Sequence, residues 1–64
     1  MYNLAILMAF DGAICGLVET YSNTFALPVL ATGPRKPLTF ATEQEATDWA
    51  NKYLVGYRWR IKPA

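Results

Sequence analysis

The residues best suited to contact a charged ligand lie near the end of the chain, in Tyr57-Arg58-Trp59-Arg60-Ile61-Lys62. Cations alternate there with bulky apolar residues, and an extended chain sends alternate side chains to opposite faces. Arg58, Arg60 and Lys62 would then form a row whose neighbours are about 6–7 Å apart. Such a row suits carboxylates or phosphates, and arginine can bind either in a bidentate manner. Arg35 and Lys36 are candidates to extend the row.

The same cations have two other interpretations. Sheet edges are often charged because charge prevents aggregation, so the row could serve the fold alone. It could also bind nucleic acid, with nearby aromatic rings as a stacking platform. The four rings in question are Trp49, Tyr53, Tyr57 and Trp59. Their spacing favours a place between a helix and a sheet over a place on the surface.

No catalytic constellation can be assembled from the remaining residues. The chain has no histidine, and its one cysteine, Cys15, lies in an apolar segment without a nearby cation to activate it as a nucleophile. Glu43 and Glu45 are two residues apart and would not face each other on a helix. The four glycines are too scattered for a phosphate-binding loop. We therefore expect no enzyme, no metal site and no cofactor.

The composition predicts a single small folded domain over residues 1–64. Hydrophobic residues make up 53% of the chain and charged residues 17%, which is too apolar for a disordered segment. The net charge of +1 conceals an asymmetry, because residues 1–32 contain two acidic and no basic residues whereas residues 33–64 contain six basic and three acidic residues. The single cysteine suits the reducing cytoplasm. Asp11-Gly12 ends the first apolar run well short of the ~20 residues of a membrane span, so no membrane partner is expected.

Turn signals predict the strands that precede the basic row. Asp11-Gly12 suits a two-residue turn between strands at 2–10 and 13–21, and a turn at Ser22-Asn23 leads into a strand at 24–31. Pro28 would place this third strand at a sheet edge. Gly33, Pro34 and Pro37 predict an irregular segment at 32–37. A helix over residues 3–10 is the alternative, since short apolar runs fit both structures.

Two-residue turns also predict which side chains share a face. They would pair Ala9 with Ile14, Leu7 with Gly16, Val18 with Leu27 and Thr20 with Phe25 on the core side. The opposite face would carry Leu4, Ile6, Met8, Phe10, Cys15 and Leu17. That face is too apolar to remain in water, so we expect a partner or a second copy to cover it. A homodimer would use Leu4, Ile6, Met8 and Leu17.

The helix that would cover the core is predicted after Thr42. Thr42 and Glu45 form a capping box, and Ala46, Trp49, Ala50, Tyr53 and Leu54 recur on one helical stripe. Gly56 suits the end of the helix. With the basic strand last, the fold is α+β in the order β-β-β-α-β, a four-stranded, mainly antiparallel sheet with the helix packed on one face.

The order of these elements resembles that of a known family. The segments that carry the likeness are 16–19, 24–29, 42–46 and Arg58-Trp59-Arg60-Ile61-Lys62-Pro63. They resemble the small phage-encoded inhibitors of bacterial RNA polymerase over roughly residues 16–63. The resemblance implies a host-takeover protein of the bacterial cytoplasm whose last strand, through Arg58 and Arg60, engages an acidic part of the polymerase jaw. The first strand and the 33–38 segment depart from the family pattern.

We therefore expect a binding protein whose partner is a bacterial host protein with an acidic surface, with RNA polymerase as the implied target. A nucleic-acid-binding module that uses the same cations, and an assembly protein that dimerises through its apolar face, are the alternatives.

Overall fold

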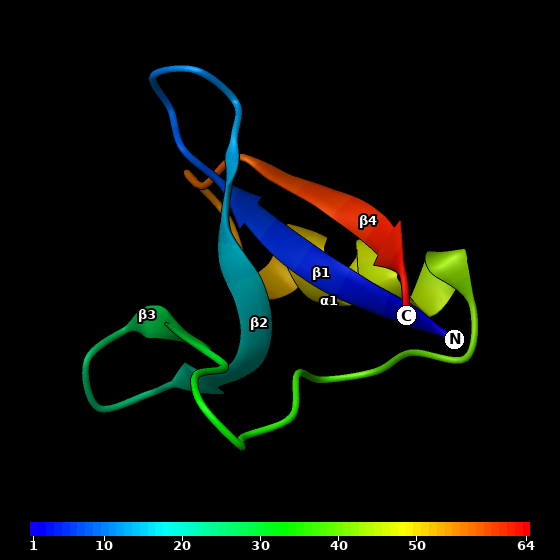
Figure 1. The fold of residues 1–64 in the computed structure, drawn as a ribbon. Helices are drawn as coiled ribbons and strands as arrows, with labels where there is room; N and C mark the ends of the chain where they lie inside the picture. Colours follow the sequence, from blue (N-terminus) through cyan, green and yellow to red (C-terminus); the bar gives the residue numbers. More distant parts are fainter.

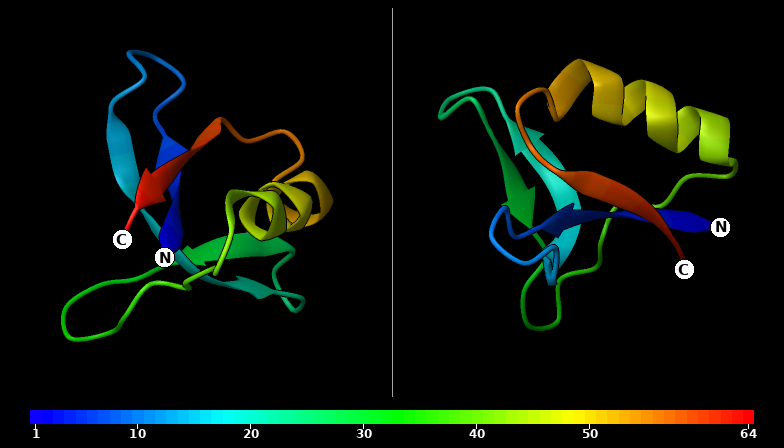
Figure 2. Two further views of the ribbon diagram at one scale, coloured as in Figure 1. Left: turned by 90° about the vertical axis from the view of Figure 1, so that its right-hand side faces the viewer. Right: turned by 90° about the horizontal axis from the view of Figure 1, so that it is seen from above.

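The apolar start of the chain is a strand in the computed structural model, which describes residues 1–64. The elements are β1 (Tyr2–Leu7), β2 (Ile14–Ser22), β3 (Leu27–Leu30), α1 (Glu43–Tyr53) and β4 (Trp59–Pro63). All strand pairs are antiparallel, in the sheet order β3-β2-β1-β4. The helix α1 lies on one face, over β1 and β4 (Figures 1 and 2). The predicted α+β fold is confirmed, and residues 2–7 are a strand rather than part of a helix.

The core lies between α1 and the sheet. Its buried side chains are Leu4, Ile6, Val18, Phe40, Ala46, Ala50 and Leu54, with Leu30, Leu38, Trp49, Trp59 and Ile61 partly buried around them. The two alanines of α1 let the helix approach the sheet closely, and the larger side chains fill the space on both sides. Burial of a leucine such as Leu4, which has no exposed surface, contributes about 1.5–3 kcal/mol.

The hairpin that joins β1 to β2 is longer than the predicted two-residue turn. The Met8 N–H donates to the carbonyl of Ala13 at 2.8 Å, so four residues form the loop. Asp11 Oδ1 accepts from the Ala13 N–H at 2.9 Å, and Gly12 has a φ of +76°. A turn at Asp11-Gly12 is thus present, but it is not the predicted two-residue turn, and the predicted pairs of Leu7 with Gly16 and Ala9 with Ile14 are wrong.

The longer loop inverts the faces of β1. Ile6 pairs with Gly16 and Leu7 with Ile14, which leaves Cys15 as an extra residue in a β-bulge. A shift of one residue moves every side chain of a strand to the other face, so Leu4 and Ile6 point into the core instead of outward. On β2 the predicted core position is confirmed for Val18, which is buried, and Cys15 is exposed as predicted. Ile14 and Thr20, which were predicted on the core side, are both exposed.

The connection from β2 to β3 also differs from the predicted turn at Ser22-Asn23. Ser22 still belongs to β2 and pairs with Leu27, and its Oγ accepts from the Phe25 N–H at 3.2 Å. Ala26 has a φ of 55° and completes the turn. The predicted pairs of Val18 with Leu27 and Thr20 with Phe25 are therefore wrong. The place of β3 and its Pro28 at a sheet edge is confirmed.

The irregular segment between β3 and α1 becomes part of the sheet near its end. The Leu38 N–H donates to the Val18 carbonyl at 2.9 Å, and Phe40 and Tyr2 exchange two backbone hydrogen bonds of 2.8 and 2.9 Å. Asn3 is buried, and its Nδ2 donates to the Leu38 carbonyl at 3.0 Å. These contacts bring Phe40 into the core beside the start of β1.

The predicted cap of α1 is present. The Thr42 Oγ1 accepts from the Glu45 N–H at 3.2 Å, while Glu45 Oε2 accepts from the N–H of Ala41 at 3.2 Å rather than from that of Thr42. At the other end the helix stops at Tyr53, and Gly56 has a φ of +87° in the connection to β4.

Loss of this cap should lower stability measurably. We expect Thr42→Ala to reduce the free energy of unfolding by about 1 kcal/mol, because the Glu45 N–H loses its acceptor. Urea unfolding followed by circular dichroism measures the change. Thr42→Ser keeps the hydroxyl and should stay close to wild type. Equal loss in both variants would show that the hydroxyl is not the cause.

Candidate partner-binding surface

β4 presents the predicted basic residues on the face that α1 leaves open. Trp59 and Ile61 are partly buried against the core, so Arg60 and Lys62 point to the opposite face, where both are exposed. Arg58 lies just before β4, and its carbonyl accepts from the Leu7 N–H at 2.8 Å, which continues the pairing with β1. We call Arg58, Arg60 and Lys62 the basic row. The predicted alternation of this segment is thus confirmed at positions 59–62.

Small side chains of β1 lie across from the basic row. The register places Arg60 opposite Ala5 and Lys62 opposite Asn3, two residues that are themselves buried. Side chains directly opposite on antiparallel strands have Cβ atoms about 4.5–5.5 Å apart, so the aliphatic stems of the cations can cover β1 while their charged ends reach water. Arg60 and Lys62 are therefore held by the paired, buried part of the sheet.

The charges of the basic row are not neutralised within the protein. The structure contains one ion pair, between Arg35 and Glu19, and it does not involve the row. Arg58 Nη1 donates to the Ala9 carbonyl at 3.1 Å, which ties this side chain to the β1–β2 loop. The side chains of Arg60 and Lys62 make no hydrogen bond. Both are available to an external anion.

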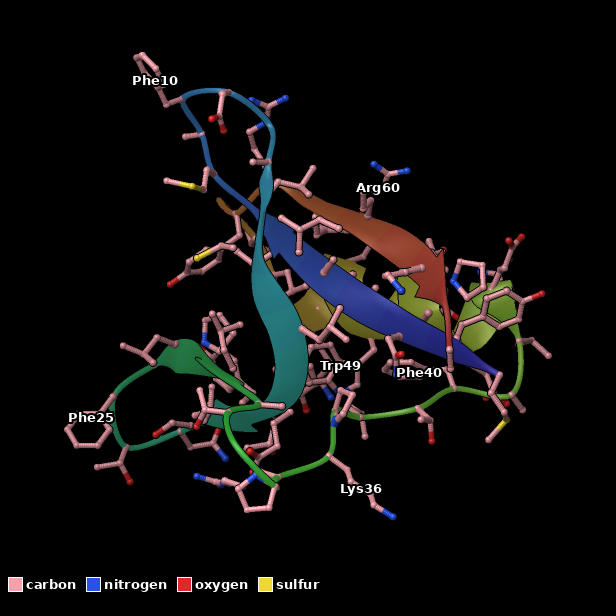
Figure 3. The ribbon with its side chains drawn as sticks, viewed as in Figure 1. Phe10, Phe25, Lys36, Phe40, Trp49 and Arg60 are labelled. Carbon is pink, nitrogen blue, oxygen red and sulfur yellow. The ribbon has the colours of Figure 1, made fainter.

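Arg35 and Lys36 do not extend the row. Arg35 Nη2 is bound to Glu19 Oε2 on β2, and β1 separates β2 from β4 in the sheet. Lys36 is exposed in the loop after β3, and Figure 3 shows it on a different part of the surface from Arg60. The prediction that these residues extend the row was based on their charge alone, and the order of the strands keeps them apart from it.

The predicted self-association surface is wrong in its composition. Leu4 and Ile6 are buried under α1, with 0% and 8% of their surface exposed, so they cannot contact a second copy. Leu17 is half-buried on the open face, and Met8 is exposed at the start of the β1–β2 loop. The two remaining residues do not form the continuous apolar face that the two-residue turn implied.

The aromatic residues of α1 are partly buried and pack against other aromatic rings. Trp49 and Tyr53 have ring centroids 4.7 Å apart, and they continue to Phe40 and to Tyr21 at 6.1 and 5.0 Å. Trp59 packs against the same core. The predicted helix–sheet position is confirmed for Trp49, Tyr53 and Trp59. Tyr57 is the exception, because it lies before β4 and is exposed.

Met8 and Phe10, predicted on the apolar outer face, are exposed around the β1–β2 loop together with Ile14, which was predicted in the core; we call these three residues the apolar tip. Phe10 is 96% exposed and points away from the protein (Figure 3). The signal that could have identified the tip is Asp11, whose side chain can accept from a backbone N–H two residues on and so favours a longer loop.

The rest of the molecule offers little further chemistry. No pocket is present on the surface, and no three His, Cys, Asp or Glu side chains gather where they could hold a metal ion. The one helix is too short to cross a bilayer. Comparisons of the chain with protein-family models, with curated proteins and with solved structures found no match.

Proposed function

We propose that this protein acts by binding another protein, and that the basic row of β4 docks on an acidic surface of that partner. The observation that carries the proposal is a set of three exposed cations, two on β4 and one just before it, none of which is paired with a carboxylate. A partner that supplies carboxylates would gain charge-assisted hydrogen bonds, and the two arginines could bind them in a bidentate manner.

The arrangement of charges supports a protein partner over nucleic acid. The nucleic-acid interpretation used five clustered cations, but Arg35 is paired with Glu19 and Lys36 lies away from the row. It also benefited from aromatic rings next to the cations, and three of the four rings are packed between helix and sheet. What remains is a short row beside an exposed apolar tip, which suits the mix of arginine and aromatic anchors found in protein interfaces.

The resemblance of the sequence to phage inhibitors of RNA polymerase suggests the first partner to test. On this proposal the protein works in the bacterial cytoplasm as a host-takeover factor, and it inhibits the enzyme by occupying an acidic surface of it. The confirmed order of elements, with the basic strand last, is compatible with that likeness.

Reversal of one charge in the row tests the proposal. We expect Arg60→Glu to weaken binding to purified bacterial RNA polymerase at least tenfold, equivalent to about 1.4 kcal/mol, because a carboxylate would face the acidic surface of the partner. Biolayer interferometry measures the affinity, and inhibition of transcription should fall in parallel. Arg60 makes no side-chain hydrogen bond within the protein, so the fold should be retained.

Lys36→Glu is the matched control. It changes the net charge by the same amount at another exposed site and should leave the affinity unchanged. Equal weakening by both variants would mean that only net charge matters, and the basic row would not be the docking site. If the wild-type protein does not bind the polymerase but retards DNA or RNA in a gel mobility-shift assay at low salt, the nucleic-acid alternative replaces the proposal.

A further inference from the structure

β4 is an edge strand, and the pairing with β1 shows which of its backbone groups are in use. The Leu7 N–H binds the Arg58 carbonyl, and the Ala64 N–H binds the Met1 carbonyl at 3.0 Å. Hydrogen-bonded pairs recur at every second residue of an antiparallel ladder. Arg60 and Lys62 therefore direct their backbone groups toward β1, as Arg58 does, and Trp59, Ile61 and Pro63 direct theirs to the free edge.

The free edge of β4 has unused hydrogen-bonding groups. Neither Trp59 nor Ile61 takes part in any backbone hydrogen bond outside the regular elements, and no other strand lies beyond β4. Pro63, which has no N–H, occupies a free-edge position where no ladder bond is lost. The edge thus offers the N–H and carbonyl groups of Trp59 and Ile61 in one line, which is the arrangement that an added strand requires.

The side chains along this edge define what kind of strand would fit. An added antiparallel strand would form hydrogen-bonded pairs with Trp59 and Ile61 and non-hydrogen-bonded pairs with Arg60 and Lys62. Opposed side chains are closest in non-hydrogen-bonded pairs, where Cα atoms are about 4.5 Å apart. Carboxylates at those positions would meet the two cations on the open face. Apolar residues between them would lie beside Trp59 and Ile61, which are only partly buried.

The same charges exclude a second copy of β4 as the occupant. Pairing two β4 strands would place cations of one copy opposite cations of the other, and like charges directly opposed are destabilising. The other edge strand, β3, has four residues, includes Pro28 and carries no cation. Charge complementarity therefore selects an acidic occupant for β4.

We infer that the free edge of β4 accepts an extended segment of the partner protein, with acidic and apolar residues in alternation, as a fifth strand of the sheet. The inference rests on the proposed function and specifies its mode of contact. It implies main-chain pairing in addition to the ion pairs of the basic row. Binding should then protect the Trp59 and Ile61 amides from hydrogen exchange.

Backbone-modified peptides test this mode of contact without altering the protein. The probe is a blocked heptapeptide in which glutamate and valine alternate, and binding is followed by NMR titration of the wild-type chain. In the antiparallel arrangement, valine N–H groups face β4 and glutamate N–H groups face away. N-methylation of the valines should weaken binding at least tenfold. N-methylation of an equal number of glutamates, which gives a peptide of the same charge and composition, should weaken it little. Exchange of the Trp59 and Ile61 amides should slow at least tenfold when the unmodified peptide is bound.

Other outcomes separate this inference from the proposed function. Equal binding of all three peptides, without protection of Trp59 and Ile61, would overturn strand addition but leave docking by charge intact. No binding of any peptide at millimolar concentration would also overturn strand addition. The comparison of Arg60→Glu with Lys36→Glu against a whole partner protein decides the proposed function independently in either case.

Discussion

Truncation of Leu4 to alanine should come close to unfolding the protein. Leu4 has no exposed surface and packs in the centre of the core beneath α1. Leucine-to-alanine changes in cores cost about 2–5 kcal/mol, since they lose transfer free energy and leave a cavity. The total stability expected for 64 residues is about 3–10 kcal/mol. We expect Leu4→Ala to lower the midpoint of thermal unfolding by about 10 °C or more, as measured by circular dichroism.

Leu17→Ala is the matched control for this prediction. Leu17 is half-buried on the open face of the sheet, so its truncation should cost clearly less than that of Leu4. The two-residue turn predicted from Asp11-Gly12 would place both leucines on the same outer face and make the two changes similar. Equal effects would therefore contradict the register of β1 and β2 described above.

A charge on the buried face of α1 should have an equally large effect. Ala50 has no exposed surface and belongs to the core between α1 and the sheet. We expect Ala50→Glu to destabilise the protein by about 4 kcal/mol or more, because an unpaired carboxylate would lose its water and the helix would be pushed from the sheet. Most molecules of this variant should be unfolded, which far-UV circular dichroism and the dispersion of NMR signals would detect.

Asn51→Glu introduces the same charge at the next residue of α1. Asn51 is exposed, and substitutions at such positions usually change stability by less than about 0.5 kcal/mol. A well-folded Ala50→Glu variant would mean that α1 does not cover the sheet through Ala46 and Ala50. The assignment of the face that α1 leaves open, and of the basic row to that face, would then be wrong.

Leu4→Ala and Ala50→Glu also serve as controls for unfolding in the binding experiments. The proposed docking residues Arg60 and Lys62 lie on the face opposite Leu4 and Ala50, so loss of binding through unfolding can be told apart from loss of a contact. Arg60→Glu should weaken binding without a change in unfolding, whereas Leu4→Ala should change both.

Local signals in the sequence determined most of the fold. The helix was predictable because Thr42, Glu45 and the apolar stripe lie within a few turns of one another and act through short-range hydrogen bonds and burial. The basic row was predictable for the same reason, since alternation over six residues suffices to place Trp59 and Ile61 inward and Arg60 and Lys62 outward.

Tertiary structure alone decided the faces of β1 and the extent of the candidate site. The Asp11 side chain allows a longer loop, and burial of Leu4 and Ile6 against α1 favours it over the two-residue turn. The strand order decided that Arg35 does not join the basic row, because Arg35 pairs with Glu19 on β2 and β1 separates β2 from β4. Contacts between residues far apart in the chain settle such questions, whereas a local signal such as Asp11 leaves more than one loop length open.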